Sequence, residues 1–328
     1  MFTERIEFVE RKFGSLFSND DQVIFFNLEK PSNCLPFSAN ELVAYQTFFP
    51  VVAQLEMAGI KCIQSMPQKK FNLAVISIPK SKKLAKHLIY LATKVVPEGL
   101  IILDGEKSNG IESVIRDLKK QIKITNVVSK AHGKTTWFET PADLEIYKDV
   151  PLQIEGGLET QAGVFSSDGV DPASKLLAQL IPRNIKGVGA DLGGGWGYLS
   201  IKALEMNSIK ELHFVEADFT ALHVAKNNLN DQRVKFYWYD ALEWEAPKLL
   251  DFIIMNPPFH HLGRAMPSLG VDFVKVASRN LKKSGTLWMV ANRHLPYEDA
   301  IRRHFSSFSE LSGSKKFKVM QAKNPINF

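Results

Sequence analysis

Gly187-Val-Gly-Ala-Asp-Leu-Gly-Gly-Gly-Trp-Gly197 is the stretch of this chain that says most about its fold. Its first six residues have the pattern of a short strand, and residues 198–206 after it have the pattern of a helix. The glycines at positions 193, 195 and 197 allow a tight turn with positive φ and let the backbone approach a ligand closely. A strand, a glycine-rich turn and a helix in this order predict a ligand-binding α/β unit.

The chain beyond this turn places polar side chains at the ends of three more predicted strands, residues 211–215, 234–239 and 252–255. Together with the residue before the glycines they form a set of four: Asp191, Glu216, Asp240 and Asn256. Ligands of open α/β sheets bind outside the carboxyl ends of the strands. We therefore expect these four side chains and the glycines to share one site.

Each acidic member of this set suits one part of a nucleoside ligand. Glu216 follows Gly197 by nineteen residues, where a carboxylate can accept hydrogen bonds from both ribose hydroxyls. Asp240 is placed to accept from an adenine amino group. Asp191 stands two residues before the first glycine of the turn, where a dinucleotide fingerprint requires no acid, and its carboxylate could bind the ammonium group of S-adenosylmethionine. The glycine turn itself fits either a dinucleotide fold or an S-adenosylmethionine fold.

The fourth strand runs into Asn256-Pro-Pro-Phe259. Two consecutive prolines cannot donate to a sheet and hold the residue before them extended, so Asn256 stands on a rigid turn. The amide of Asn256, the carbonyl of Pro257 and the ring of Phe259 can together grip the edge and face of a planar amine. A plain strand followed by a proline turn is the alternative, and the polar residues at the other strand ends argue against it.

Residues 163–181, upstream of the glycine turn, are predicted to form a loop and then a helix. Asp171 followed by Pro172 is typical of a helix N-terminus, with the aspartate as cap and the proline in the first helical position. The loop before Asp171 is expected to lie over whatever the second sheet binds.

The first half of the chain also alternates strands and helices, as parallel α/β units do. We expect strands at 23–26, 73–76, 100–103 and 134–138, and helices at 40–57, 82–95 and 111–121. No glycine-rich turn follows any of these strands. Residues 71–80 align with 250–259 without a gap, and Ser77 falls on Asn256. Either the chain holds two related units, the first without the amide and the aromatic ring, or the two segments are alike by chance.

The fold class is therefore α/β, with two tandem units of mostly parallel sheet flanked by helices. A chain of 328 residues is long for a single core. The polar segment 139–160, rich in Gly and Pro, separates the two units. We place the first unit at 1–150 and the second at 151–328.

Composition limits the classes of protein to which the chain can belong. Its 45% hydrophobic and 23% charged residues are ordinary for a globular protein. No apolar run approaches the roughly 20 residues of a membrane span, and the N-terminus lacks a signal-peptide pattern. The two cysteines, Cys34 and Cys62, form no CxxC motif, and no histidines cluster at ligand spacing. We expect a cytoplasmic protein with no metal and no membrane partner.

One segment is strongly basic, although the net charge is only +6. Between Met57 and Pro97 there is no carboxylate, and there are eight lysines: Lys61, Lys69, Lys70, Lys80, Lys82, Lys83, Lys86 and Lys94. This lysine block is either a solvated helix face or a surface for the phosphate backbone of a nucleic acid.

The glycine turn followed by Asn256-Pro-Pro-Phe259 resembles the class I S-adenosylmethionine-dependent methyltransferases that act on exocyclic amines. More narrowly, the chain is similar to the RsmC-like enzymes, the bacterial guanine-N2-methyltransferases of small-subunit ribosomal RNA. The stretches that carry this likeness span the second half: Gly163-Val-Phe-Ser-Ser-Asp-Gly-Val-Asp171, Asn256-Pro-Pro-Phe-His260, Val290-Ala-Asn-Arg-His-Leu-Pro-Tyr297 and Lys316-Phe-Lys-Val-Met-Gln-Ala322. Weaker likeness around Ile78-Pro-Lys-Ser-Lys82 and Asp104-Gly-Glu-Lys-Ser-Asn-Gly110 fits that family's degenerate first domain. Gly194 and Trp196 depart from the family, in which Cys-Gly-x-Gly is commoner.

The resemblance implies two tandem Rossmann-like methyltransferase units, the first a degenerate one that binds RNA and the second the catalytic one. The enzyme is then expected to methylate the N2 amine of a guanine in 16S rRNA, with Asn256, Pro257 and Phe259 as its catalytic residues. S-adenosylmethionine is expected to be bound by Asp191, Gly193, Gly195, Glu216, Asp240 and Asn256. The expected partner is ribosomal RNA or the assembled small subunit. Because two fused units can mimic a dimer within one chain, we expect a monomer.

Four alternatives stay open. The first is the same reaction on 23S rRNA, because the sister enzyme of the large subunit shares Asn-Arg-His-Leu and the two-domain layout. The second is N5-methylation of a protein glutamine, whose amide is another planar nitrogen. A nicotinamide dehydrogenase would use the glycines and Glu216 but leaves Asn-Pro-Pro-Phe unexplained. A non-catalytic RNA-binding factor would be expected to have lost one of the four strand-end residues.

Overall fold

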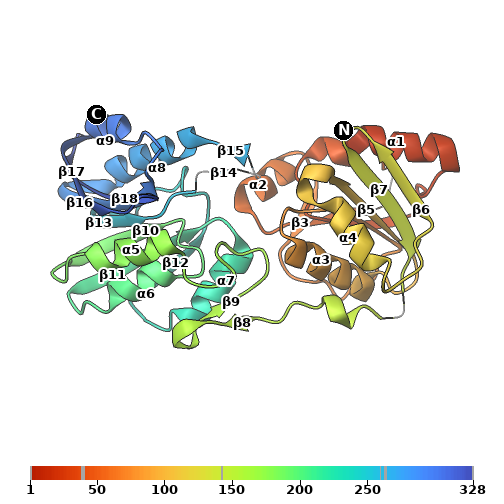
Figure 1. Ribbon diagram of the computed structural model, residues 1–328, viewed down its shortest axis with the longest axis horizontal. Coiled ribbons are helices and arrows are strands. Elements are labelled where there is room, and N and C mark those ends of the chain that lie inside the picture. The colour runs from red at the N-terminus through yellow and green to blue at the C-terminus, as the bar shows by residue number, and fades with distance from the viewer. Residues whose placement is uncertain (1, 38–40, 142, 259, 262–263, 327–328) are drawn as a thin grey trace. The chain divides into compact units, whose positions relative to one another are not determined.

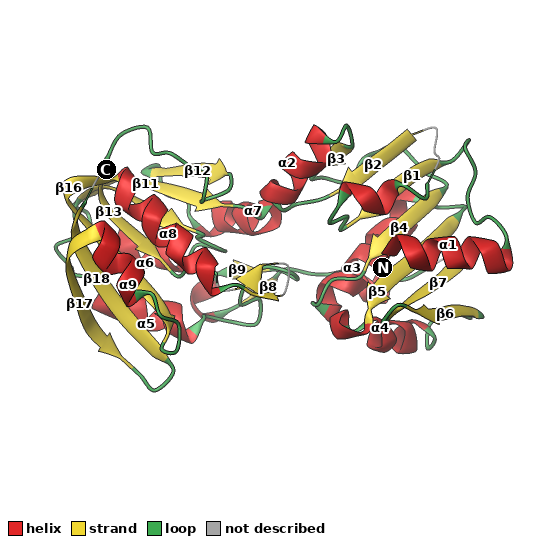
Figure 2. Ribbon diagram, turned by 90° about the horizontal axis from the view of Figure 1, so that it is seen from above, coloured by secondary structure: helices red, strands yellow, loops and turns green. Residues whose placement is uncertain are grey.

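The computed structural model describes the chain except for residues 1, 38–40, 142, 259, 262–263 and 327–328. The chain divides into two compact units, Met1–Val150 and Pro151–Phe328. Each unit is built around one seven-stranded sheet, and helices cover both faces of each sheet (Figures 1 and 2). The expected α/β class is confirmed.

The first unit has the strand order β3-β2-β1-β4-β5-β7-β6. Its strands are β1 (Gln22–Phe26), β2 (Glu41–Tyr45), β3 (Lys61–Ile63), β4 (Leu73–Ser77), β5 (Leu100–Glu106), β6 (Asn126–Lys130) and β7 (Gly133–Glu139). Its helices are α1 (Phe2–Phe13), α2 (Phe49–Met57), α3 (Lys82–Val95) and α4 (Ile111–Leu118). Strands β1 to β5 pair in parallel, and β7 joins β5 and β6 in antiparallel pairs.

The second unit has the strand order β12-β11-β10-β13-β16-β18-β17. The strands of this sheet are β10 (Gly187–Leu192), β11 (Ile209–Glu216), β12 (Val234–Trp238), β13 (Leu250–Met255), β16 (Leu281–Asn292), β17 (Phe305–Gly313) and β18 (Phe317–Pro325). The helices are α5 (Pro172–Leu180), α6 (Tyr198–Leu204), α7 (Phe219–Asn228), α8 (Pro267–Asn280) and α9 (Glu298–His304). Two small ribbons add β8 (Leu152–Gln153) with β9 (Glu159–Thr160), and β14 (His260–His261) with β15 (Arg264–Ala265).

The two sheets have the same topology, strand for strand. Five parallel strands in each are followed by an antiparallel pair at the same edge. Strand β4 in the first sheet takes the place that β13 takes in the second, so the gapless alignment of 71–80 with 250–259 corresponds to equivalent strands. The prediction of two related units is confirmed at the level of the fold.

Apolar runs explain why the central strands form where they do. The side chains of Leu73 to Ile76 in β4 and of Phe252 to Met255 in β13 are all buried, as expected for parallel strands covered on both faces. Helices α1 and α2 pack on one face of the first sheet, and α3 and α4 on the other. In the second unit α5, α6 and α7 cover one face, and α8 and α9 cover the other. Truncating one large side chain in these layers would cost about 2–5 kcal/mol.

The expected helix over 40–57 is wrong. In its place the structure has the strand β2, a short connection and the helix α2. The run Leu-Val-Ala-Tyr is too short to distinguish a strand from a helix by its period. Pro50 lies in the first turn of α2, where proline is favoured, and it marks the true start of the helix. Strand β6 was not predicted, whereas α3 and β10 have the predicted bounds.

The lysine block is largely compensated by carboxylates from other parts of the first unit. Five of its eight lysines form ion pairs: Lys69 with Glu41, Lys82 and Lys86 with Asp117, Lys83 with Asp149, and Lys94 with Glu145. The Nζ of Lys70 donates to the carbonyl of Lys94. This pairing favours the solvated, ion-paired surface over an uncompensated positive one. None of the helices in the described chain is long and apolar enough to cross a membrane.

Candidate active site

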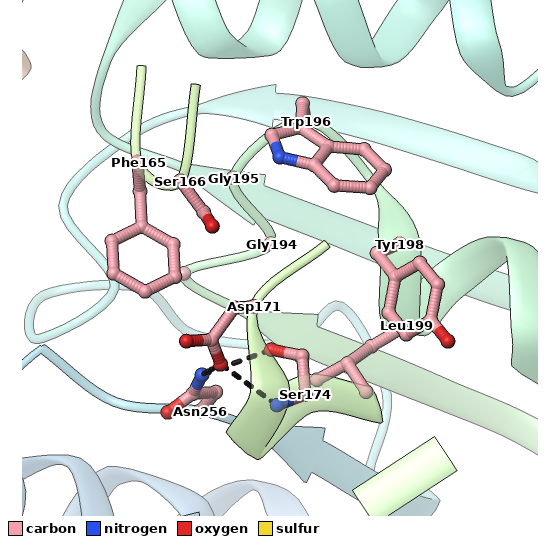
Figure 3. A pocket seen from close by; sticks show the side chains of 11 residues that line it. Phe165, Ser166, Asp171, Ser174, Gly194, Gly195, Trp196, Tyr198, Leu199 and Asn256 are labelled. Carbon is pink, nitrogen blue, oxygen red and sulfur yellow. Dashed lines mark hydrogen bonds between the residues drawn. The ribbon is translucent and has the colours of Figure 1, made fainter. Parts of the chain in front are cut away.

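The candidate site lies where the strand order of the second sheet reverses. The chain leaves β10 toward β11 on one side and later returns to pair β13 with the other side of β10. Ligands of open α/β sheets bind at such a switch point. A pocket that opens to solvent lies there (Figure 3). Its lining residues are Phe165, Ser166, Asp171, Ser174, Gly193, Gly194, Gly195, Trp196, Tyr198, Leu199 and Asn256.

The glycine turn forms one wall of this pocket. Gly193, Gly195 and Gly197 have φ angles of 73°, 60° and 100°, which side chains of L-residues rarely tolerate. A Cβ atom added to Gly195 would meet nothing within 4 Å. The backbone conformation, rather than lack of space, therefore requires glycine here, and the open space leaves room for a ligand against the turn.

Glu216 is joined to the turn at the end of β11. Its Oε2 accepts a hydrogen bond of 2.8 Å from the amide of Gly195, and its Oε1 accepts one of 2.8 Å from the amide of Asp218. Burial raises the pKa of Glu216 to about 7, although these amide hydrogen bonds oppose the rise. Each carboxylate oxygen has a second lone pair. Glu216 thus stabilises the glycine turn, and its carboxylate can still accept a hydrogen bond from a ligand.

Asp191 lies beneath the pocket rather than in its wall. It is fully buried, and its Oδ2 accepts a hydrogen bond of 2.7 Å from the hydroxyl of Ser200 on α6. Its Oδ1 has no hydrogen-bond partner in the described part of the chain. Burial raises the pKa of Asp191 to about 7, and the bond from Ser200 offsets only part of that rise. The expected contact of Asp191 with an ammonium group stays a prediction.

Asp240 follows β12, and it is not among the pocket-lining residues. Its Oδ1 accepts a hydrogen bond of 2.9 Å from the amide of Leu242 and so holds the turn after the strand. Nearby, Trp244 is 3% exposed and packs on the rings of His213 and Tyr237, which makes it a core residue.

Asn256 directly follows β13 and faces the pocket. Its amide nitrogen donates two hydrogen bonds of 2.9 Å, one to Oδ2 of Asp171 and one to Oγ of Ser174, both at the start of α5 (Figure 3). Asp171 also caps α5, as predicted, because its Oδ2 accepts from the amide of Ser174 at 2.8 Å. Pro257 is buried, and Phe259 lies outside the described residues.

The loop before α5 supplies residues that were not predicted individually. Phe165 lines the pocket and is 60% exposed, whereas its neighbour Val164 is buried against Trp196. The hydroxyl of Ser166 donates to the carbonyl of Gly169 at 2.8 Å and so holds the loop in a compact turn. The expectation that this loop lies over the site is confirmed, because Phe165 and Ser166 line the pocket. The sequence held one signal for Phe165 and Ser174, namely an aromatic and a hydroxyl residue close to the predicted cap Asp171.

Comparison with known proteins agrees with this geometry. Residues 155–321, half of the chain, match the family model described as "Methyltransferase small domain", and residues 15–140 match that of its N-terminal domain. The chain belongs to the methyltransferase small domain family. It is 31% identical over 287 residues to the ribosomal RNA small subunit methyltransferase C of Shewanella loihica, covering 83% of each chain. It is 28% identical to the ribosomal RNA large subunit methyltransferase G of Yersinia enterocolitica, covering 76% of this chain and 67% of the other.

A solved structure shows the same fold over both units of this methyltransferase. The 16S rRNA N2 methyltransferase of T. thermophilus, in complex with AdoMet and guanosine, superposes with a TM-score of 0.76 at 22% identity. The match covers 97% of this chain and 91% of the other. The likeness to the RsmC-like enzymes is confirmed by these relatives.

S-adenosylmethionine, the cofactor of this methyltransferase, fits the pocket on two observations. Open space lies against the left-handed turn at Gly195, and the Glu216 carboxylate is tied to the same turn. In the described residues, no three His, Cys, Asp or Glu side chains gather so that they could hold a metal ion.

Proposed function

We propose that this methyltransferase transfers a methyl group from S-adenosylmethionine to the exocyclic N2 amine of a guanine in 16S ribosomal RNA. The presence of Asn256 in the same pocket as the glycine turn is the observation that carries the proposal. The relatives named for the small ribosomal subunit support the choice of RNA. The T. thermophilus protein of the same fold, which is named as a 16S rRNA N2 methyltransferase, supports it as well.

The chemistry requires that a poor nucleophile be oriented. The lone pair of the guanine amine is delocalised into the ring, which makes the amine a poor nucleophile. Hydrogen bonds to its two hydrogens orient the lone pair toward the methyl group. The bound cofactor supplies an electrophilic methyl group on a sulfonium sulfur. Asn256 Oδ1 and the Pro257 carbonyl would accept the two amine hydrogens and stabilise the positive charge that develops on nitrogen. Alignment of this kind can contribute about 7–11 kcal/mol.

No general base is needed, because the protonated product amine loses its proton readily to water. Phe259 is assigned the role of stacking on the target base once that base has left its helix or loop. Asp191, Gly193, Gly195, Glu216 and Asp240 are assigned to the cofactor. Of these, Gly193 and Gly195 line the pocket and Glu216 is bonded to its wall, which supports their assignment most directly.

The two units are assigned different tasks. The second, residues 151–328, is the catalytic unit, and the first, residues 1–150, is a degenerate copy that binds RNA. The substrate is proposed to be the assembled small subunit or its RNA, and the active form a monomer. The same reaction on 23S rRNA is a second candidate, because relatives named for the large subunit also match most of this chain.

The test is methyl transfer from labelled S-adenosylmethionine to purified small and large ribosomal subunits and to their free RNA, followed by mapping of the modified base. The proposal requires label at the N2 position of a single guanine of 16S rRNA. Label on 23S rRNA alone would select the second candidate, and label on a protein glutamine would contradict both.

A further inference from the structure

We infer that Asp171 and Ser174, at the N-terminus of α5, are positioning residues that fix which way the amide of Asn256 points. The inference rests on the proposed function, since it concerns the amide that is assigned to the target amine. Asp171 thereby has two tasks, capping a helix and orienting a catalytic side chain.

The amide nitrogen of Asn256 carries two hydrogens. Both are taken up, one by Oδ2 of Asp171 and one by Oγ of Ser174, each at 2.9 Å. An amide nitrogen has no third hydrogen to donate. The amide oxygen is therefore the part of this side chain left for a substrate, and Figure 3 shows it on the side away from Asp171.

The reverse orientation is excluded by charge. An ionised carboxylate can only accept hydrogen bonds. If the Asn256 amide rotated by half a turn, its oxygen would lie at hydrogen-bond distance from Oδ2 of Asp171 with no hydrogen between them. Such an unpaired contact between two acceptors is strongly unfavourable in a partly buried site. An amide nitrogen aimed at the substrate would meet the hydrogens of the guanine amine and repel them.

The two positioning residues are themselves held firmly. The Ser174 amide donates to Asp171 Oδ2 at 2.8 Å, and the Asp171 carbonyl accepts from Lys175 at 2.9 Å in the first turn of α5. Pro172 stands at the start of the same helix, and Ser174 is only 7% exposed. A side chain on a rigid turn after β13 is thus oriented by a rigid helix end, which is the arrangement that precise catalysis needs.

Reciprocal exchange of the two partners tests this role. Asn256→Asp alone places two carboxylates against each other, and we expect at least a 100-fold loss of methyl transfer. Asp171→Asn alone keeps an oxygen that can accept from both donors and still caps the helix, so transfer should stay within about fivefold of the wild type. In the double variant the side-chain nitrogen at position 171 can donate to the carboxylate at position 256, at the cost of the bond from the Ser174 amide. An oxygen still faces the pocket, so transfer should recover at least tenfold over Asn256→Asp.

Two further variants separate orientation from loss of the helix cap. Ser174→Ala removes one acceptor and keeps the cap, so kcat should fall about three- to tenfold with little change in the Kd for S-adenosylmethionine. Ser81→Ala is the matched control, because Ser81 caps α3 in the first unit by accepting from the amide of Leu84 and does not line the pocket. It should leave kcat unchanged.

A readout that needs no activity keeps the inference testable if the proposed substrate is wrong. The side-chain amide signals of Asn256, identified by their loss in Asn256→Asp, should exchange hydrogen with water at least tenfold more slowly than an exposed amide. They should become fast in Asp171→Ala. Fast exchange in the wild type, or a double variant no more active than Asn256→Asp, would overturn the inference. Failure of the wild type to methylate ribosomal subunits would instead overturn the proposed function.

Discussion

The two sheets of this chain have the same strand order, and the pocket described above lies at the strand ends of the second. Strand pairing makes the comparison residue by residue. Phe25 lies between Ala44 and Val75 as Asp191 lies between Phe214 and Ile254. Counting along the chains from this register and from that of β3 and β12, the first unit has Phe25, Asn27, Gln46, Met66 and Ser77 where the second has Asp191, Gly193, Glu216, Asp240 and Asn256.

In the first unit two of these side chains, Asn27 and Gln46, donate to carbonyls of the same unit. Asn27 has a φ of 57°, much like that of Gly193, and its side chain donates to the carbonyl of Ser77 at 2.9 Å. The side-chain nitrogen of Gln46 donates to the carbonyl of Leu28 at 2.8 Å, whereas the Glu216 carboxylate accepts from Gly195. The first unit thus has a similar backbone turn, but the side chains at its strand ends donate to carbonyls of the same unit. A strand end can therefore preserve its shape and lose its site through a few side chains.

The element after the turn differs too. In the second unit the chain enters α6 directly from Gly197, while in the first unit only a short 3-10 turn, Pro31–Cys34, follows β1. A helix N-terminus is a favourable place for a polar ligand. The first unit lacks that feature as well as the glycines.

The largest expected effect comes from Asn256 and its counterpart. Asn256→Ala removes an acceptor aimed at the developing charge, which typically costs about 2.7–4 kcal/mol, or about 100- to 1,000-fold in kcat. Calorimetric titration should find the Kd for S-adenosylmethionine within about threefold of the wild type. Ser77→Ala, at the equivalent position, should leave kcat unchanged. Equal losses of transfer and of cofactor affinity in Asn256→Ala would remove Asn256 from the catalytic role.

The second largest effect is expected where the two units differ by an acid and an amide, Glu216 in the second unit and Gln46 in the first. Glu216→Gln introduces the residue type of the first unit and replaces a charged acceptor, a bond worth about 1.5–3 kcal/mol. We expect the Kd for S-adenosylmethionine to rise about 10- to 100-fold by calorimetry. Gln46→Glu, the reverse change, removes the donor to Leu28 and should lower the free energy of unfolding by about 1–3 kcal/mol in urea, with cofactor affinity intact. Unchanged affinity in Glu216→Gln would contradict its assignment to the cofactor.

A third prediction concerns pH, because Asp191 and Glu216 titrate and their counterparts Phe25 and Gln46 do not. The pKa of Asp191 is raised to about 7 from 3.8, so the folded chain holds this proton more tightly than the unfolded chain. The stability gained is complete below pH 3.8 and is lost as the pH rises through 7, at up to about 1.4 kcal/mol for each pH unit. Asp191→Asn does not titrate, and its melting temperature should fall less than that of the wild type between pH 5 and about pH 8. Parallel pH curves for the two proteins would refute the raised pKa.

The smallest effect is expected at the lysine block of the first unit. Lys82 and Lys86 both pair with Asp117, at 2.8 and 2.9 Å. The double change Lys82→Gln and Lys86→Gln should raise the KM for RNA by no more than about threefold, because Asp117 already compensates both charges and leaves less of them for a phosphate. Asp117→Asn frees both charges and should lower the KM slightly at low salt. A loss of RNA affinity above tenfold in the double variant would identify the block as a principal RNA contact.

The glycine turn and the four strand ends could be predicted from the sequence because each is a local pattern. An apolar run stops at a polar residue, and parallel strands bring such ends to one edge of the sheet. The contact between Asn256 and Asp171 could not be predicted in this way. It joins residues 85 positions apart, and nothing in the local pattern of a helix cap says which other side chain the cap will meet.

The burial of Asp191 was missed for a related reason. The alternation of a strand does not show which of its faces the helices will cover when both are covered, and Asp191 turns toward Ser200 on α6 rather than into the pocket. Phe165 was predicted only as part of a loop, since exposure depends on which neighbour, here Val164, is anchored in the core.

The inward hydrogen bonds of Asn27 and Gln46 have a thermodynamic consequence. In the first unit these side chains bond to carbonyls of the same unit, so its strand ends offer S-adenosylmethionine no comparable set of acceptors. The second unit keeps its acceptors for a molecule that binds the folded chain alone, and such binding raises stability with ligand concentration. Added S-adenosylmethionine should therefore delay the melting of one half of this chain and leave the other half where it was, so that the cofactor sets the order in which the two halves unfold.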